Sequence, residues 1–218
     1  MKQKGLCASA LLCALLASAH TASAHQPAYI DTQTAVSIPD ADTSRAYYGE
    51  LTGTPAMYTI SSDKDFSLYL NILSPYLPGA KQDFSVTVTN ATGTTIATLN
   101  APVTAWQEWY EEFAGDTYWK GPEFKQPVPA GTYTISVSNP GNTGKYVLAP
   151  GEAEVFSVKG TPSTIQEIYL VKTYFFEKPW YSVFEGIIGK VLLGMLALFT
   201  ALLCLIVFIL YRRTRKSN

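Results

Sequence analysis

Apolar and polar positions alternate along most of the chain between residues 46 and 160, which predicts a series of short β-strands. Over residues 66–72, Phe, Leu and Ile at every second position alternate with Ser, Tyr and Asn, the period of a strand with one buried face. The same period recurs over 84–88 and 132–138. Shorter apolar runs add further strands, at 47–51, 57–60, 145–149 and 153–158.

Turn residues, and no helical pattern, separate these strands. The Asn-Ala-Thr-Gly turn at 90–93 predicts a hairpin between 84–89 and 94–99. Many short strands joined by turns favour an all-β fold, an antiparallel jelly-roll-like β-sandwich over residues 46–160. Residues 25–45 are rich in Thr, Ser, Asp, Ala and Pro without a clear period, so we expect a flexible lead-in there.

The pattern changes from strand to helix after residue 160. Residues 161–178 form a predicted connector helix, in which Ile165, Ile168, Tyr169, Lys172 and Phe176 share one face. A hydroxyl cap and an early proline precede it, and Pro179 interrupts it.

A second helix follows that is long and apolar enough to cross a bilayer. Residues 191–211 carry no charge, and at 1.5 Å per residue they span about 30 Å, the thickness of one hydrocarbon core. We predict a transmembrane helix over 187–211, with an interfacial belt of Lys178, Trp180, Tyr181 and Phe184 before it.

The first 24 residues have the three zones of a secretory signal peptide. Lys2 and Lys4 precede an apolar core over 6–17, and Ala22-Ser23-Ala24 suits a signal peptidase. The basic tail, 212–218, then places the C-terminus in the cytoplasm by the positive-inside rule. We therefore expect a single-pass protein of the cell membrane, with its N-terminal domain extracytoplasmic, at the periplasmic side or cell surface.

Charge and cysteine usage exclude several functions. All seventeen acids lie between Asp31 and Glu185, whereas only ten bases lie between Arg45 and Lys190. Residues 31–190 therefore carry a net charge of −7, which argues against a nucleic-acid partner. After signal cleavage the chain retains Cys204, within the apolar helix, and His25. This leaves no disulfide, no cysteine-based zinc site and no well-placed histidine for a catalytic triad.

One pair of segments resembles a known family. Residues 129–137, Pro-Ala-Gly-Thr-Tyr-Thr-Ile-Ser-Val, are followed at 144–148 by Gly-Lys-Tyr-Val-Leu. This resembles the closing hairpin of bacterial pre-peptidase C-terminal-type jelly rolls. The resemblance implies a non-catalytic domain that contacts carbohydrate or protein. It does not extend to the protease that such domains usually accompany.

Residues 106–124 are chemically unusual, with three of the four tryptophans and five acids, and we expect a loop there. One hypothesis is an aromatic ligand-binding platform for a sugar or a protein, made of Trp106, Trp109, Tyr110, Tyr118 and Trp119. A second hypothesis is a Ca²⁺ site with oxygen ligands from Glu111, Glu112, Asp116 and Glu123. A third is that the aromatic side chains only plug one end of the sandwich.

Two carboxylate pairs in this segment, Glu108 with Glu123 and Glu112 with Asp116, match the minimum that a glycosidase needs. A sandwich of this size offers little room for a deep cleft, so we expect no enzyme, no catalytic residue and no cofactor beyond the hypothetical calcium.

Small residues recur on one stripe of the apolar helix, at Gly194, Ala197, Ala201 and Cys204. Such a stripe allows close helix approach, so it predicts a homo-oligomer. Two functions remain open from the sequence. The first is a membrane-tethered, non-enzymatic binding module that acts through residues 106–124. The alternative is an accessory or structural subunit of a membrane complex that acts through the apolar helix and the connector.

Overall fold

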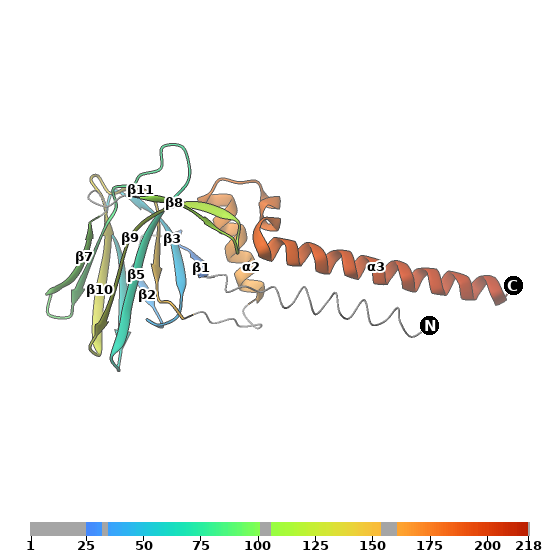
Figure 1. Ribbon diagram of the computed structural model, residues 1–218, viewed down its shortest axis with the longest axis horizontal. Coiled ribbons are helices and arrows are strands. Elements are labelled where there is room, and N and C mark those ends of the chain that lie inside the picture. Colours follow the sequence, from blue (N-terminus) through green and yellow to red (C-terminus); the bar gives the residue numbers. More distant parts are fainter. Residues whose placement is uncertain (1–24, 32–34, 101–105, 154–160, 218) are drawn as a thin grey trace.

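The computed structural model describes residues 25–31, 35–100, 106–153 and 161–217, and it shows a two-sheet β-sandwich followed by helices (Figure 1). The six-stranded sheet has the order β1-β3-β11-β5-β9-β8 and the five-stranded sheet the order β2-β4-β10-β6-β7. The strands are β1 (Gln26–Tyr29), β2 (Val36–Ile38), β3 (Arg45–Thr52), β4 (Ala56–Ser62), β5 (Phe66–Pro75), β6 (Ser85–Asn90), β7 (Thr95–Asn100), β8 (Gln107–Glu111), β9 (Asp116–Val128), β10 (Gly131–Ser138) and β11 (Thr143–Pro150).

The strands predicted from alternation are present with the expected faces buried. Leu68, Leu70 and Ile72 of β5 are fully buried, and so are Val86 and Val88 of β6. Side chains from both sheets meet in one core, which we call the inner core. The hairpin predicted around residues 90–93 is formed by β6 and β7. The two-sheet, mostly β architecture is therefore confirmed.

The predicted flexible lead-in is wrong where the structure describes it, because residues 26–29 and 36–38 form edge strands. β1 pairs with β3 and β2 pairs with β4, in both cases in parallel. Both strands are short and pair on one side only, so their sequence carries too few residues to show a period. The expectation of a purely antiparallel sandwich is corrected by these two pairs.

The two segments that resemble the pre-peptidase C-terminal pattern do not pair as a hairpin. β10 belongs to the five-stranded sheet and β11 to the six-stranded sheet. The turn between them therefore carries the chain from one sheet to the other. Asn139 stabilises this turn, because its side-chain oxygen accepts a hydrogen bond from Thr143 N at 3.0 Å.

The connector folds against the outer face of the six-stranded sheet. It consists of α2 (Thr161–Leu170) and the π-helical turn η3 (Val171–Phe175), and the 3₁₀ helix η4 (Trp180–Phe184) follows it. η3 joins an apolar group on that face, which we call the outer cluster: Ala46, Tyr48, Leu73, Tyr118, Val147, Ala149, Val171, Phe175 and Phe176. Of the face predicted for the connector, Ile168, Lys172 and Phe176 are buried, whereas Tyr169 is exposed.

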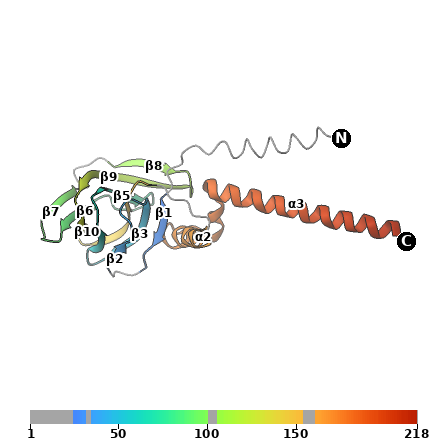
Figure 2. The same ribbon diagram turned by 90° about the horizontal axis from the view of Figure 1, so that it is seen from below.

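A long helix, α3 (Gly186–Ser217), projects from the sandwich (Figures 1 and 2). In the described part of the chain it is the one helix long and apolar enough to cross a membrane, with a mean hydropathy of 2.9 and none of its apolar window buried. The predicted signal peptide, residues 1–24, lies outside the described residues.

Candidate functional site

Residues 107–111 and 116–124, predicted as part of a loop, belong instead to a hairpin of β8 and β9. Both views show this hairpin reaching from the sandwich toward the start of α3 (Figures 1 and 2). Directly opposed residues of an antiparallel pair share one face of the sheet. The register pairs Trp109 with Tyr118 and Glu108 with Trp119, so these two pairs lie on opposite faces. The predicted aromatic platform is therefore divided.

One face of the hairpin is covered by the connector. Tyr118 is 2% exposed and its hydroxyl forms a 2.9 Å hydrogen bond with the Tyr48 hydroxyl. Its ring meets Phe176 edge-on at 5.2 Å and Trp109 at 5.8 Å. Burial raises the pKa of Tyr118 well above its ordinary value. Tyr118 and Trp109 thus hold the connector on the sandwich and present no open platform.

The opposite face of the hairpin is more open. It carries Glu108, Tyr110 and Trp119, and the Trp119 ring packs against the tilted ring of Tyr76 with centroids 4.8 Å apart. Tyr110 is 54% exposed and Tyr76 is 44% exposed. Two of the five predicted platform residues are thus available on one surface.

Trp106 lies apart from both faces, packed against the inner core. Its ring fills the space beside Gly121, where a Cβ would lie 2.6 Å from the indole. For this residue the structure agrees with the third hypothesis, in which the aromatic side chain seals the sandwich.

A buried ion-pair network lies at the hairpin tip. The Asp116 carboxylate is 2.9 Å from Lys172 Nζ and 2.9 Å from Lys178 Nζ. Both lysines also reach Glu185, at 3.3 Å and 2.9 Å. The side chains of Asp116 and Lys172 are fully buried, whereas that of Glu185 is 46% exposed. Two positive and two negative groups thus join β9, the connector and the residue just before α3.

The pKa values follow from these contacts. Burial disfavours the charged form of Lys178, but its hydrogen bonds to Glu185 and Asp116 outweigh burial and raise its pKa. Burial likewise opposes ionisation of Glu185. The hydrogen bond that Glu185 accepts from Lys178 and the nearby positive charge of Lys172 outweigh this effect, so the pKa of Glu185 is lowered. Both groups therefore favour their charged forms in this network.

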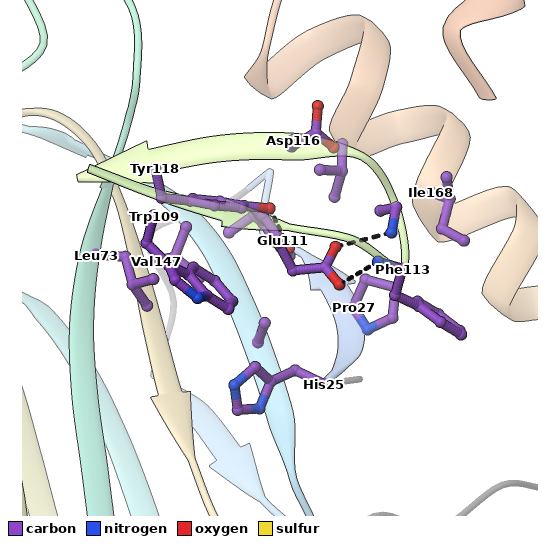
Figure 3. A pocket seen from close by; sticks show the side chains of 14 residues that line it. His25, Pro27, Leu73, Trp109, Glu111, Phe113, Asp116, Tyr118, Val147 and Ile168 are labelled. Atoms are coloured by element: carbon purple, nitrogen blue, oxygen red, sulfur yellow. Dashed lines mark hydrogen bonds between the residues drawn. The ribbon is translucent and has the colours of Figure 1, made fainter. Parts of the chain in front are cut away.

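Glu111 shapes the turn of the hairpin. Its carboxylate accepts hydrogen bonds from the backbone N–H groups of Phe113 at 2.7 Å and Ala114 at 2.8 Å (Figure 3). Burial raises its pKa, and these two hydrogen bonds oppose the rise.

The same turn is bonded to the first turn of α3. The N–H groups of Ile187 and Ile188 donate to the carbonyls of Glu112 and Phe113, at 3.0 and 3.2 Å. Free N–H groups at a helix start need acceptors, and here the hairpin supplies two of them. The chains approach so closely that a Cβ on Gly115 would lie 2.5 Å from Gly186 N.

The four acids of the calcium hypothesis are not gathered. Asp116 is engaged by lysines, Glu111 by backbone N–H groups, and Glu123 by Lys120 at 3.1 Å, while Glu112 is exposed. Among the described residues no group of three or more acidic, histidine or cysteine side chains could hold a metal ion. The geometry therefore gives no support to calcium at these residues.

A small pocket lies beneath the hairpin, between the outer cluster and α2 (Figure 3). Trp109, Glu111, Tyr118 and Ile168 line it, and His25 closes one side. Its volume of about 30 Å³ has room for one or two water molecules and for no larger ligand.

The stripe of Gly194, Ala197, Ala201 and Cys204 is exposed along α3. Self-association through this stripe stays a prediction.

Sequence reasoning missed Lys172, Lys178, Glu185 and Gly115 as parts of the site. One signal was visible, since Lys172 falls on the apolar face of the connector, where a charge needs a partner. No short-range pattern connects it to Asp116, which precedes it by more than fifty residues.

No family model and no curated protein matches the chain. Among solved structures, the pre-peptidase C-terminal domain of a collagenase from Bacillus anthracis is similar over 56% of this chain and 97% of that domain, with 14% identity and a TM-score of 0.37. The catalytic domain of a GH87 α-1,3-glucanase in complex with nigerose is similar over 51% of this chain and 22% of that one, with 14% identity and a TM-score of 0.26. Such low scores carry no argument about function.

Proposed function

We propose that this chain is a non-enzymatic accessory subunit of a membrane complex, whose sandwich is held in a fixed orientation on one membrane-spanning helix. One observation carries the proposal: the β8–β9 turn is bonded to the first turn of α3 through Ile187 and Ile188. The segment with the most distinctive chemistry thus joins the sandwich to the helix.

The junction has the features of a rigid connection. A flexible tether would be a solvated, polar or glycine-rich linker. Here the buried Asp116–Lys172 pair, the outer cluster and the contact of Gly115 with Gly186 hold the sandwich, the connector and α3 together. A rigid junction transmits a movement or a position of the helix to the sandwich, which suits a subunit assembled with membrane partners.

The orientation in the membrane is part of the proposal. Arg212, Arg213 and Arg215 follow the apolar stretch, so the C-terminus lies in the cytoplasm and the sandwich lies outside.

The test compares the full chain with two variants, each purified from host membranes in mild detergent. In the first variant an artificial Leu/Ala helix of equal length replaces residues 191–211 and leaves the junction intact. The second is Trp119→Ala, on the open face of the hairpin. A stoichiometric membrane partner should co-purify with the wild type and with Trp119→Ala, and be lost when the helix is replaced. Loss only in Trp119→Ala, or no partner in any sample, would refute the accessory role.

A second function, a binding module, is favoured by the open face of the hairpin. Glu108, Tyr110 and Trp119 with Tyr76 offer aromatic rings beside a carboxylate, which is suited to a sugar or a protein contact. Under this alternative the sandwich would be a jelly roll of the pre-peptidase C-terminal type. The variant Tyr110→Ala/Trp119→Ala should then keep the fold and lose ligand capture, whereas Trp109→Ala should destabilise the junction.

A further inference from the structure

The short helix η4 lies beside the first turn of α3 and not above it. The chain turns sharply at Glu185 and Gly186, where Gly186 has a φ of +66°. This turn brings the backbone of Phe184 against Gly189, so closely that a Cβ on Gly189 would lie 2.0 Å from the Phe184 carbonyl carbon. The end of η4 thus lies beside α3, level with Gly189, about one turn after the start of that helix.

η4 is held rigidly in this place. The Ser182 side chain is buried and its hydroxyl donates to the Pro179 carbonyl at 2.7 Å. Just before it, Lys178 is fixed by Asp116 and Glu185, each at 2.9 Å. Lys178 was expected to face lipid headgroups, but it serves this internal network instead.

Two large aromatic side chains nevertheless point away from the protein. Trp180 is 64% exposed and Tyr181 is 59% exposed, the highest values for aromatic residues outside α3 in the part of the chain that the structure describes. Their rings pack edge-on at 6.0 Å. Each combines an apolar body with one polar group, the combination that favours the headgroup layer of a bilayer.

The helix length gives the depth of these rings. The uncharged stretch begins at Val191, and the five residues from Gly186 to Lys190 rise about 7.5 Å above it. The headgroup layer adds about 5–7 Å on each side of the hydrocarbon core. Because Phe184 lies level with Gly189, the end of η4 falls within this layer when α3 spans the membrane.

We propose that η4 is a second membrane contact, in which Trp180 and Tyr181 lie among the lipid headgroups beside α3 and fix the tilt of the sandwich. A single helix leaves the sandwich free to tilt with the helix axis. A second contact beside the axis restricts that motion. The inference rests on the proposed function, since it requires α3 to cross the bilayer.

The test uses the full chain in phosphatidylcholine vesicles, with lipids that carry a nitroxide quencher either on the headgroup or in mid-chain. The fluorescence of Trp180 is obtained as the difference between wild type and Trp180→Phe, because Trp106, Trp109 and Trp119 also emit. The headgroup quencher should quench this difference signal strongly and the mid-chain quencher weakly, and aqueous iodide should have little access to it. A signal that iodide quenches and lipid quenchers do not would overturn the inference.

Two glycine variants test the placement itself. Gly189→Ala should push η4 from the helix and lose the headgroup quenching of Trp180, whereas Gly194→Ala should keep it, since no described atom lies within 4 Å of a Cβ there. Unchanged quenching in Gly189→Ala would contradict the placement.

Flotation of the vesicles separates the two proposals. A chain that fails to float contradicts the membrane span. A chain that floats with an iodide-exposed Trp180 contradicts only the second contact.

Discussion

Replacing Asp116 by Asn tests the junction directly. The substitution removes the negative charge that faces Lys172, whose side chain has no solvent exposure. Lys172 then keeps only the Glu185 carboxylate as an anionic partner, at 3.3 Å from its Nζ. Removing one partner of a buried pair costs about 3–5 kcal/mol, because the other charge stays buried without compensation. Glu185 retains part of the compensation, so we expect a loss at the lower end, about 3 kcal/mol.

The assay is the thermal unfolding of the purified full chain in mild detergent, followed by near-ultraviolet circular dichroism. For a protein of this size 1 kcal/mol corresponds to about 2–4 °C, so the Asp116→Asn variant should melt about 6–12 °C lower. Lys172→Met should cost less, since Asp116 keeps Lys178 at 2.9 Å. The double variant should recover part of the loss, because it leaves no buried lysine at position 172 without its partner carboxylate.

A matched control is Glu123→Gln on the same strand. Its side chain is 54% exposed and pairs with Lys120 at 3.1 Å, so the change should cost no more than about 1 kcal/mol. If Asp116→Asn melts within the range of this control, the buried pair contributes nothing to the junction and the reasoning is refuted.

Three further substitutions test the hairpin tip and the outer cluster. Gly115→Ala should lower the melting temperature more than Gly93→Ala. Both glycines have a φ of +79°, but among the described residues only Gly115 of the two contacts another segment. Equal losses in melting temperature would rule out a tight contact at Gly115. Glu111→Gln should gain stability relative to wild type as the pH rises above 4.5, because the raised pKa of Glu111 makes its ionised form unfavourable in the folded protein. A stability difference in urea unfolding that does not change with pH would contradict this. Tyr48→Phe should lower the free energy of unfolding by about 1–3 kcal/mol, because it leaves the buried Tyr118 hydroxyl unpaired. Adding Tyr118→Phe should restore much of this loss. Additive losses in urea unfolding would argue against the hydrogen bond.

Alternation was enough to predict the central strands, because each has one face in the inner core. It failed for β8 and β9, where Trp109 and Tyr118 face the connector while Tyr110 and Trp119 face outward. With aromatic residues on both faces, the period of two disappears from the sequence. The strand assignment there depends on a covering element that follows in the chain only after residue 160.

The site was even less accessible to sequence reasoning. The acids of residues 106–124 indicated a ligand, yet Asp116 is ion-paired with lysines and Glu111 is hydrogen-bonded within the protein. The partners of Asp116 are two lysines, Lys172 and Lys178, and those of Glu111 are backbone N–H groups of a tight turn. Both depend on tertiary contacts, and composition alone does not distinguish an acid that binds a metal from one that neutralises a buried lysine.

The N-terminal edge strand β1 has a consequence for how the fold is completed. β1 joins the sheet through β3, and the backbone N–H of Tyr29 donates at 2.7 Å to Glu167 of α2, 138 positions further along. β1 is therefore synthesised well before the helix that supplies this acceptor. A nascent chain that stops before α2 lacks the acceptor, so β1 should dock fully against the rest of the fold only after α2 has been made.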